Sequence, residues 1–222
     1  MEVFGENDID IFAEPARIMI SGTSGAGKTT LLCKLVLAYE FKFDIILVCG
    51  SKNHQLENIK EIKDKLFIRE EITNPFDYKI NENTSILYVL DDCFEQANKS
   101  EIVSKVFTAG RHKKCSTIFL VQNLMGNGPQ RRTISLNCTH FIFLRQRDIR
   151  QIQYIAREIY GKKLAEEFAN NYKEIITGNP HSYVLVDLSN TTPEPLRIRG
   201  NLFGEQGIPY QIIYQWNAER NY

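Results

Sequence analysis

The 222-residue sequence predicts an α/β fold, with a mostly parallel central sheet and helices on both of its faces. Apolar runs of strand length alternate with helical patterns along the chain, which is typical of parallel strands joined by helical crossovers. The length suits one full-sized domain. With 43% hydrophobic and 24% charged residues, the composition excludes a disordered or fibrous protein.

The first half of the chain predicts four strands, one of them at the edge of the sheet, and one long helix. ARIMI (16–20) is a short buried strand, TTLLCKLVLAYE (29–40) has the pattern of a helix, and DIILVCG (44–50) is a second strand. The polar stretch 51–83 predicts short helices and loops, with an edge strand at 66–68. SILYVL (85–90) is the next buried strand.

The second half continues the alternation. A helix is predicted at 96–110, strands at 116–122 and 139–144, and two helices at 149–161 and 162–175, separated at Gly161. A last strand is predicted at 182–188, after which two prolines turn 188–200 into an edge hairpin. The domain is expected to span 14–205, between an N-terminal extension (1–13) and a C-terminal extension (206–222).

Charge and cysteine usage limit the functional classes. Lysine plus arginine and aspartate plus glutamate both number 27, which excludes a protein that coats nucleic acid by bulk charge, so any nucleic-acid site must be local. No apolar run reaches the roughly 18 residues of a membrane span, and the acidic start lacks the features of a signal peptide. We expect a soluble intracellular protein without membrane contact. The five cysteines lack CxxC spacing and are expected to be reduced and mostly buried.

The strongest chemical signal is GTSGAGKT, which fits the phosphate-binding motif G-x-x-x-x-G-K-[ST] between a predicted strand and a predicted helix. Its glycines let the backbone wrap a polyphosphate, so that amide hydrogens and the positive end of the helix face it. Lys28 neutralises the β and γ phosphates, and the Thr29 hydroxyl ligates Mg²⁺. A GTPase switch is disfavoured because no base-reading N-K-x-D follows an apolar strand, so ATP and Mg²⁺ are the expected cofactors. The residues expected to bind the nucleotide are Gly22, Thr23, Ser24, Gly25, Ala26, Gly27, Lys28, Thr29 and Thr30.

Polar residues follow two further strands. SILYVL ends in Asp91 and Asp92, which supply the second carboxylate that this motif needs for Mg²⁺. Asp91 is expected to hold the metal through water, and Asp92 stands where many related ATPases carry a longer glutamate that orients the attacking water. Gln122, the last residue of the predicted strand 116–122, is a candidate sensor of the γ phosphate. Alternatively, it caps the turn that follows the strand.

Basic residues cluster at 111–114, at 131–132 and at 145–150, and each cluster taken alone is more often a solvated face than a site. Arg131 and Arg132 follow the loop GNGPQ, which could project into a central channel. Arginines on a loop suit sequence-independent contact with phosphates. These two residues are therefore the candidates for nucleic-acid contact.

Several strings together resemble viral genome-packaging ATPases of the FtsK/HerA superfamily, in the compact forms carried by double-jelly-roll-capsid DNA viruses and related large transposons. They are GKTTLL, the LDD ending of the strand, FTAGRHKK, STIFLVQNL, RRTISLN and TPEPLRIR, and the resemblance covers residues 14–205. It implies a RecA-like P-loop NTPase that works as an ATP-driven motor and translocates double-stranded DNA into a capsid. It also implies a homo-oligomeric ring with a capsid or portal partner, inside the host cell and associated with the virion or the assembling capsid.

The resemblance assigns roles residue by residue. Lys28 and Thr29 serve phosphate and Mg²⁺, Asp91 and Asp92 form the Walker B pair, and Gln122 is the sensor. Arg111 is a candidate arginine finger for a neighbouring subunit, because no arginine closely follows the phosphate loop; Arg131 or Arg132 could serve instead, or Arg111 could only cap a helix.

Two other functional classes stay open at this point. One is a P-loop kinase of a nucleoside or metabolite, which would use Arg131, Arg132 or Arg145 as phosphate clamps. The other is a regulatory switch that binds nucleotide without turnover.

Overall fold

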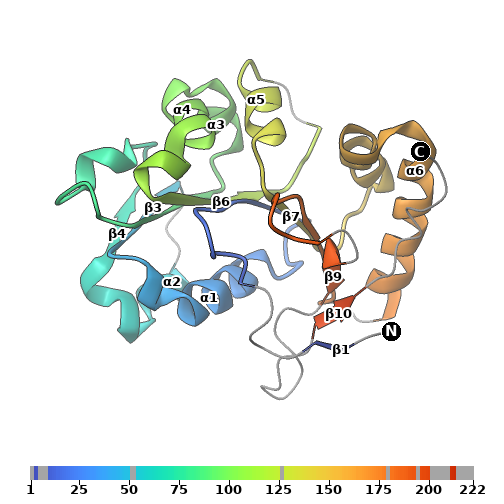
Figure 1. The fold of residues 1–222 in the computed structure, drawn as a ribbon, viewed down its shortest axis with the longest axis horizontal. Coiled ribbons are helices and arrows are strands. Elements are labelled where there is room, and N and C mark those ends of the chain that lie inside the picture. Colours follow the sequence, from blue (N-terminus) through green and yellow to red (C-terminus); the bar gives the residue numbers. More distant parts are fainter. Residues whose placement is uncertain are drawn as a thin grey trace.

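The computed structural model describes residues 3–4, 10–50, 54–125, 128–178, 181–193, 196–200 and 211–213 (Figure 1). The helices are α1 (Lys28–Ala38), α2 (His54–Glu57), α3 (Phe94–Lys99), α4 (Glu101–Ala109), α5 (Arg131–Leu136) and α6 (Ile149–Gly178). The strands are β1 (Val3–Phe4), β2 (Arg17–Ser21), β3 (Ile45–Gly50), β4 (Leu66–Arg69), β5 (Ile86–Asp91), β6 (Cys115–Val121), β7 (His140–Phe143), β8 (Val184–Asp187), β9 (Ile198–Gly200) and β10 (Gln211–Ile213).

The described strands form one sheet of ten, in the order β1-β10-β9-β8-β7-β2-β6-β5-β3-β4. From β4 to β7 all neighbours are parallel. The register places Ser21, the last residue of β2, opposite Val121 of β6 and Phe143 of β7. The carboxyl ends of β2, β6 and β7 therefore lie at one edge of the sheet, where ligands of open α/β folds bind.

Helices cover both faces of the parallel part, as predicted (Figure 1). Alternate residues of β2 show why: Ile18 and Ile20 pack with Leu32 of α1, whereas Met19 packs on the other face with Phe107 of α4. Strands covered on both faces become continuous apolar runs, which is the pattern that the sequence carries. The predicted α/β class with a largely parallel sheet is confirmed.

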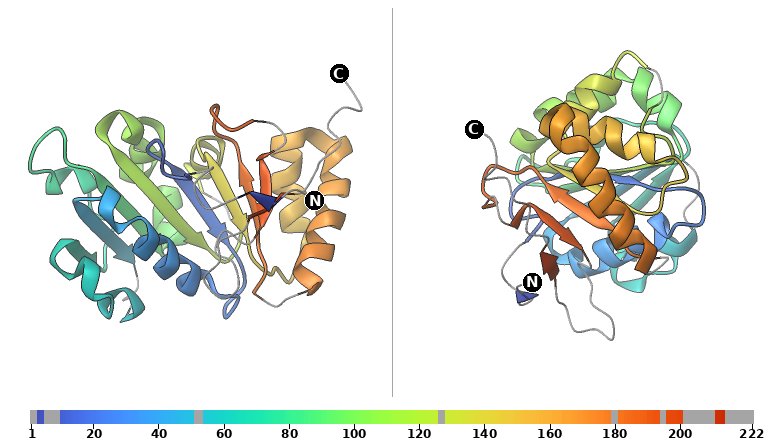
Figure 2. Two further views of the ribbon diagram at one scale, coloured as in Figure 1. Left: turned by 60° about the horizontal axis from the view of Figure 1, so that its bottom comes forward. Right: turned by 90° about the vertical axis from the view of Figure 1, so that its right-hand side faces the viewer.

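The remaining four strands, β8, β9, β10 and β1, add to the sheet in antiparallel fashion. The chain can enter β8 antiparallel to β7 because α6 is broken at Gly161. The φ of 77° and ψ of 172° at this residue are not helical. Val184, the first residue of β8, pairs with Phe143, the last of β7, so the chain returns at the carboxyl edge. Figure 2 shows α6 beside this antiparallel end of the sheet. The predicted break at Gly161 is confirmed.

Two local predictions were wrong. The single helix expected at 96–110 is divided into α3 and α4 by Ser100, which has an extended backbone and caps α4 by accepting a hydrogen bond from Val103 N at 3.3 Å. Serine favours this capping position over a helix interior. The hairpin expected at 188–200 does form from β8 and β9, but it is not at the edge, because β10 and β1 from the two terminal extensions pair beyond it. The edge strand expected at 66–68 is β4.

Four of the five cysteines are buried and Cys33 is half-buried, and all are free thiols. Within the part of the chain that the structure describes, no helix is both long and apolar enough to cross a membrane.

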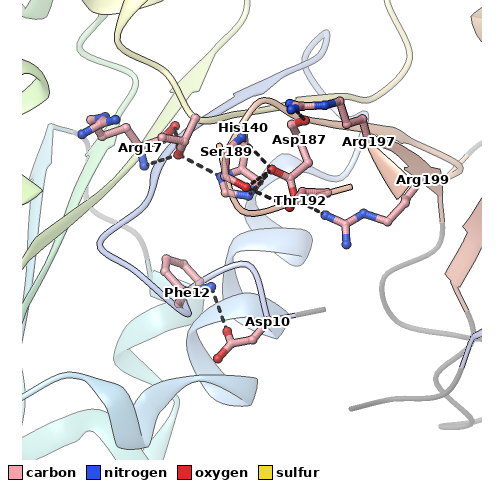
Figure 3. A network of polar contacts seen from close by, with 10 residues as sticks. Asp10, Phe12, Arg17, His140, Asp187, Ser189, Thr192, Arg197 and Arg199 are labelled. Atoms are coloured by element: carbon pink, nitrogen blue, oxygen red, sulfur yellow. Dashed lines mark hydrogen bonds and ion pairs between the residues drawn. The ribbon is translucent and has the colours of Figure 1, made fainter. Parts of the chain in front are cut away.

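A buried polar network joins β7, β8 and β9 around Asp187 (Figure 3). One carboxylate oxygen accepts from Arg199 Nη2 at 2.5 Å and from Thr192 Oγ1 at 2.7 Å. The other accepts from Ser189 Oγ at 2.6 Å and lies 3.3 Å from His140 Nε2. Burial raises the pKa of Asp187, but the hydrogen bond and charge of His140 and the hydrogen bonds of Ser189 outweigh it and hold the pKa below its usual value.

Because its pKa is lowered in the folded state, Asp187 should stabilise the protein above about pH 4 and lose that contribution as the pH falls below it. We expect Asp187→Asn to lower the free energy of unfolding by about 3 kcal/mol at pH 7, since it removes the carboxylate that faces the charge of buried Arg199. At pH 3, the difference in the free energy of unfolding between the wild type and Asp187→Asn should be about 1 kcal/mol smaller than at pH 7. Urea unfolding at both pH values measures this.

The control for this experiment is Asp148→Asn, which removes a carboxylate from an exposed ion pair with Arg150 and should change little. Equal effects of the two substitutions, or a difference that does not depend on pH, would contradict the role of Asp187.

Candidate nucleotide-binding site

The motif GTSGAGKT forms the loop between β2 and α1, as predicted. Gly25 and Gly27 have φ angles of 76° and 97°, in the left-handed region that favours glycine. Gly22 is favoured for a different reason: a Cβ there would lie 3.0 Å from Leu144 Cβ and 3.2 Å from Ala26 Cβ, closer than most such contacts. The glycines therefore fix the shape of the loop, and α1 begins at Lys28.

Neighbouring strand ends hold this loop in place. Gly22 N donates to Val121 O at the end of β6 at 3.2 Å, and Thr23 N donates to Arg145 O after β7 at 3.0 Å. The phosphate loop is thus fixed between the strands on both sides of β2.

The side chain of Lys28 folds back over the loop. Its Nζ donates to Gly22 O at 2.7 Å and to Thr23 O at 3.0 Å. Burial lowers the pKa of Lys28, while the charges of Asp91 and Asp92 oppose that shift. The charges of both carboxylates therefore act on this ammonium group, although they come from the end of a strand that is not adjacent to β2.

The structure also brings Asp92 and Gln122 together. Asp91 is the half-buried last residue of β5, and Asp92 follows it, exposed, with a φ of 53°. This left-handed turn, which aspartate tolerates better than most residues, aims the two consecutive carboxylates differently. Gln122 follows β6 and its Nε2 donates to Asp92 Oδ1 at 3.3 Å. Lys28, the aspartate pair and Gln122 thus share the carboxyl edge of the sheet.

Sequence reasoning missed Gly50, the last residue of β3. It pairs with Asp91, and its φ is 116°. A Cβ at this position would lie 1.8 Å from Asp91 O, so no other residue fits without moving the aspartate. The glycine at the end of an apolar strand was a readable signal of a close backbone approach. His181 was also missed: its Nδ1 lies 3.7 Å from the Cβ position of Gly27, and no motif surrounds it.

Arg111 does not belong to this edge in its own chain. It is exposed, in a 3₁₀ turn (Gly110–Lys113) that precedes β6, whereas the phosphate loop follows the carboxyl end of β2. The seven residues of β6 span about 20 Å at a rise of about 3.3 Å each. Arg111 can serve a phosphate loop only in another subunit.

Arg131 and Arg132 begin helix α5 and differ from each other. Arg131 is turned inward: its Nε donates to Leu124 O at 3.1 Å, its Nη1 donates to Tyr154 Oη at 2.7 Å, and the guanidinium lies 4.5 Å from the centre of the Tyr154 ring. Arg132 is exposed. Residues 126 and 127 of the preceding loop lie outside the described residues.

Comparison with known proteins identifies the family. The family model described as Poxvirus A32 protein matches residues 4–169, which is most of the chain. The chain belongs to the Poxvirus A32 family. The predicted resemblance to viral genome-packaging ATPases is confirmed by this family and, for the fold, by a solved packaging NTPase. No curated protein matches this A32-family chain.

Solved structures agree on the fold of this A32-family chain. The genome-packaging NTPase B204 of Sulfolobus turreted icosahedral virus 2, in complex with ATP-γS, has a TM-score of 0.56 at 12% identity, covering 80% of this chain and 94% of that chain. B204 of Sulfolobus turreted icosahedral virus, described as a DNA-packaging ATPase, has a TM-score of 0.55 at 12% identity, covering 84% and 97%. The type VII secretion ATPase EccC of Thermomonospora curvata has a TM-score of 0.55 at 14% identity, covering 80% and 24%.

The contact between Gly50 and Asp91 can be tested directly. We expect Gly50→Ala to weaken Mg²⁺-dependent binding of ATP by about tenfold or more, because the added methyl group displaces the aspartate. Titration with ATP, with and without Mg²⁺, measures this. The control is Gly161→Ala, at a glycine with a φ of 77° and no atom within 4 Å of its Cβ position, which adds backbone strain but no collision. If Gly161→Ala weakened ATP binding as much as Gly50→Ala does, the role of Gly50 would be refuted.

Proposed function

We propose that this protein is an ATPase that drives double-stranded DNA into a viral capsid. The observation that carries the proposal is the arrangement at the carboxyl edge: Lys28 Nζ lies over the phosphate loop, the charges of Asp91 and Asp92 act on it, and Gln122 holds Asp92. These are the groups that phosphoryl transfer from a nucleotide requires. The chain belongs to the A32 family and has the fold of viral packaging NTPases.

ATP and Mg²⁺ fit the residues present. The loop from Gly22 to Thr30 offers glycines in the required conformations and the ammonium of Lys28 for the phosphates. Thr29 and Asp91 offer oxygen ligands, which Mg²⁺ prefers. Mg²⁺ bound there neutralises negative charge on the β and γ phosphates.

Hydrolysis then depends on Asp92 and Gln122. The Asp92 carboxylate is exposed at the edge and orients the attacking water, from which it accepts a proton. Gln122 donates to one oxygen of this carboxylate and so fixes its direction. The side chain of Asp92 is shorter than a glutamate by one methylene, and its left-handed backbone changes the direction in which it leaves the strand.

DNA contact is assigned to the region of Arg131 and Arg132. Arg132 is exposed and contacts the phosphate backbone, while Arg131 holds the start of α5 against Leu124 and Tyr154. A neutral protein with local arginines binds DNA through phosphate contacts, without reading bases.

The active form is a homo-oligomeric ring in the host cell, docked on a capsid or portal protein. Within one chain, Arg111 lies at the amino edge of the sheet, so its own phosphate loop is out of reach. A neighbouring subunit can present it to the γ phosphate, where an arginine supplied in trans accelerates hydrolysis by about a thousandfold or more.

The function is tested by steady-state ATP hydrolysis with and without long double-stranded DNA. The wild type should be stimulated by DNA, and Lys28→Ala should lose about a hundredfold or more in rate. Lys34→Ala, an exposed lysine on the same helix, is the control and should behave as the wild type. In a separate titration of DNA binding at several salt concentrations, Arg132→Ala should weaken binding to all DNA sequences alike and flatten its salt dependence.

Other outcomes separate the alternatives. Indifference to DNA combined with stimulation by a nucleoside or metabolite would establish a small-molecule kinase. Tight nucleotide binding with almost no turnover, with or without DNA, would establish a regulatory switch.

The ring is tested by mixing two inactive variants. Neither Arg111→Ala nor Lys28→Ala should hydrolyse ATP alone, but mixed rings contain interfaces in which an intact phosphate loop faces an intact Arg111, so part of the activity should return. Lys105→Ala, at an exposed lysine on α4 for which the described part of the chain shows no contact with Arg111, is the control and should stay active. Full activity of Arg111→Ala alone, or no recovery in rings that demonstrably exchange subunits, would exclude Arg111 from this role.

A further inference from the structure

The segment that follows β7 supports the phosphate loop through several hydrogen bonds. Leu144 N donates to Ser21 O at 2.8 Å, directly before the loop. Arg145 O accepts from Thr23 N at 3.0 Å and from Thr23 Oγ1 at 3.3 Å. Gln146 Nε2 donates to Ser21 Oγ at 2.6 Å. The position of the loop therefore depends on the position of residues 144–146.

One side chain fixes this segment from behind. Tyr172, from the part of α6 after the Gly161 break, donates through its hydroxyl to Leu144 O at 2.7 Å and accepts from Gln146 N at 3.0 Å. Tyr172 is buried, and burial raises its pKa to about 12, so the hydroxyl keeps the proton that it donates.

The hydroxyl is not needed to dock α6. The same part of the helix packs into the core through Ala165, Phe168, Ala169 and Ile176, and the ring of Tyr172 belongs to this apolar cluster. Both hydrogen-bond partners of the hydroxyl are backbone groups of the segment that holds the phosphate loop. Removing the hydroxyl alone leaves these two groups without Tyr172, so the segment and the loop are held less firmly by the bonds that remain to Ser21 and Val121.

We propose that Tyr172 is a positioning residue for nucleotide binding, which acts on the phosphate loop through residues 144–146. The inference rests on the proposed nucleotide site but not on DNA translocation. It makes α6 a part of the site, although the side chain of Tyr172 bonds only to the supporting segment.

The test compares Tyr172→Phe with Thr84→Val. Thr84 is buried at the amino edge, and its hydroxyl accepts from Ile80 N at 3.2 Å and from Asn81 N at 3.0 Å. Each substitution removes one hydroxyl and two bonds to the backbone, and Thr84→Val also removes the bond that this hydroxyl donates to Asn81 Oδ1 at 3.5 Å, so both should lower the melting temperature. Only Tyr172→Phe should weaken binding of Mg-ATP, by about tenfold, with a matching rise in KM and with kcat within about twofold.

A second variant keeps the proposal testable if Tyr172→Phe folds poorly. Gln146→Met removes the bond to Ser21 Oγ on the other side of the segment and should weaken binding by a similar factor. The double variant should add little, because both residues act through one segment.

Unchanged ATP binding in Tyr172→Phe, equal weakening in Thr84→Val, or simple additivity in the double variant would overturn the proposal. The readout is binding of Mg-ATP without DNA. A wild type that binds ATP but is not stimulated by DNA would contradict the packaging function alone and leave this comparison intact.

Discussion

The charge of Lys28 is the interaction on which the carboxyl edge of the sheet depends. Two aspartates lie near it, and a triphosphate brings further negative charge to the same place. Without a cation between them, the carboxylates and the phosphates would repel each other. Lys28 is held by carbonyl groups of its own loop, so this charge has a fixed position before any nucleotide arrives. Fixed charges of this kind need no rearrangement during the reaction.

The order of the strands determines which groups meet that charge. β6 lies between β2 and β5, so Asp91 and Asp92 approach from one strand away, and Gln122 stands between them and the phosphate loop. Helix α6 contacts both sides of this arrangement. Its second part holds residues 144–146 through Tyr172, and its first part holds Leu124, where Gln151 Oε1 accepts from the backbone N at 2.9 Å. The region assigned to DNA contact and the region assigned to ATP are therefore joined by one element.

Much of this arrangement could be predicted because it follows from local pattern and one topological rule. The glycines around Lys28 specify their own loop, and parallel strands bring Asp92 and Gln122 to the same edge whatever their exact neighbours are. The remaining parts of the site depend on which strands and helices lie next to each other, and no local sequence pattern encodes that. Gly50 matters only because β3 lies beside β5, and Tyr172 only because α6 packs behind β7.

Two further features depend on contacts between distant parts of the chain. The inward position of Arg131 could not be predicted, because it depends on Leu124 O and on Tyr154, 23 residues further along the chain. The strand at β8 was predicted, but its antiparallel direction relative to β7 was not, because that direction depends on where the helix after Gly161 delivers the chain.

The position of Arg111 at the edge opposite the phosphate loop constrains the symmetry of any assembly that uses it. When a second copy places its amino edge, with Arg111, against the carboxyl edge of the first, its own carboxyl edge and phosphate loop stay uncovered. A third copy can then bind there in the same way. Such heterologous contacts repeat by a single rotation and close only after a full turn. In a closed circle every subunit completes the site of one neighbour and borrows from the other, whereas an open chain always ends in one phosphate loop that has no arginine facing it.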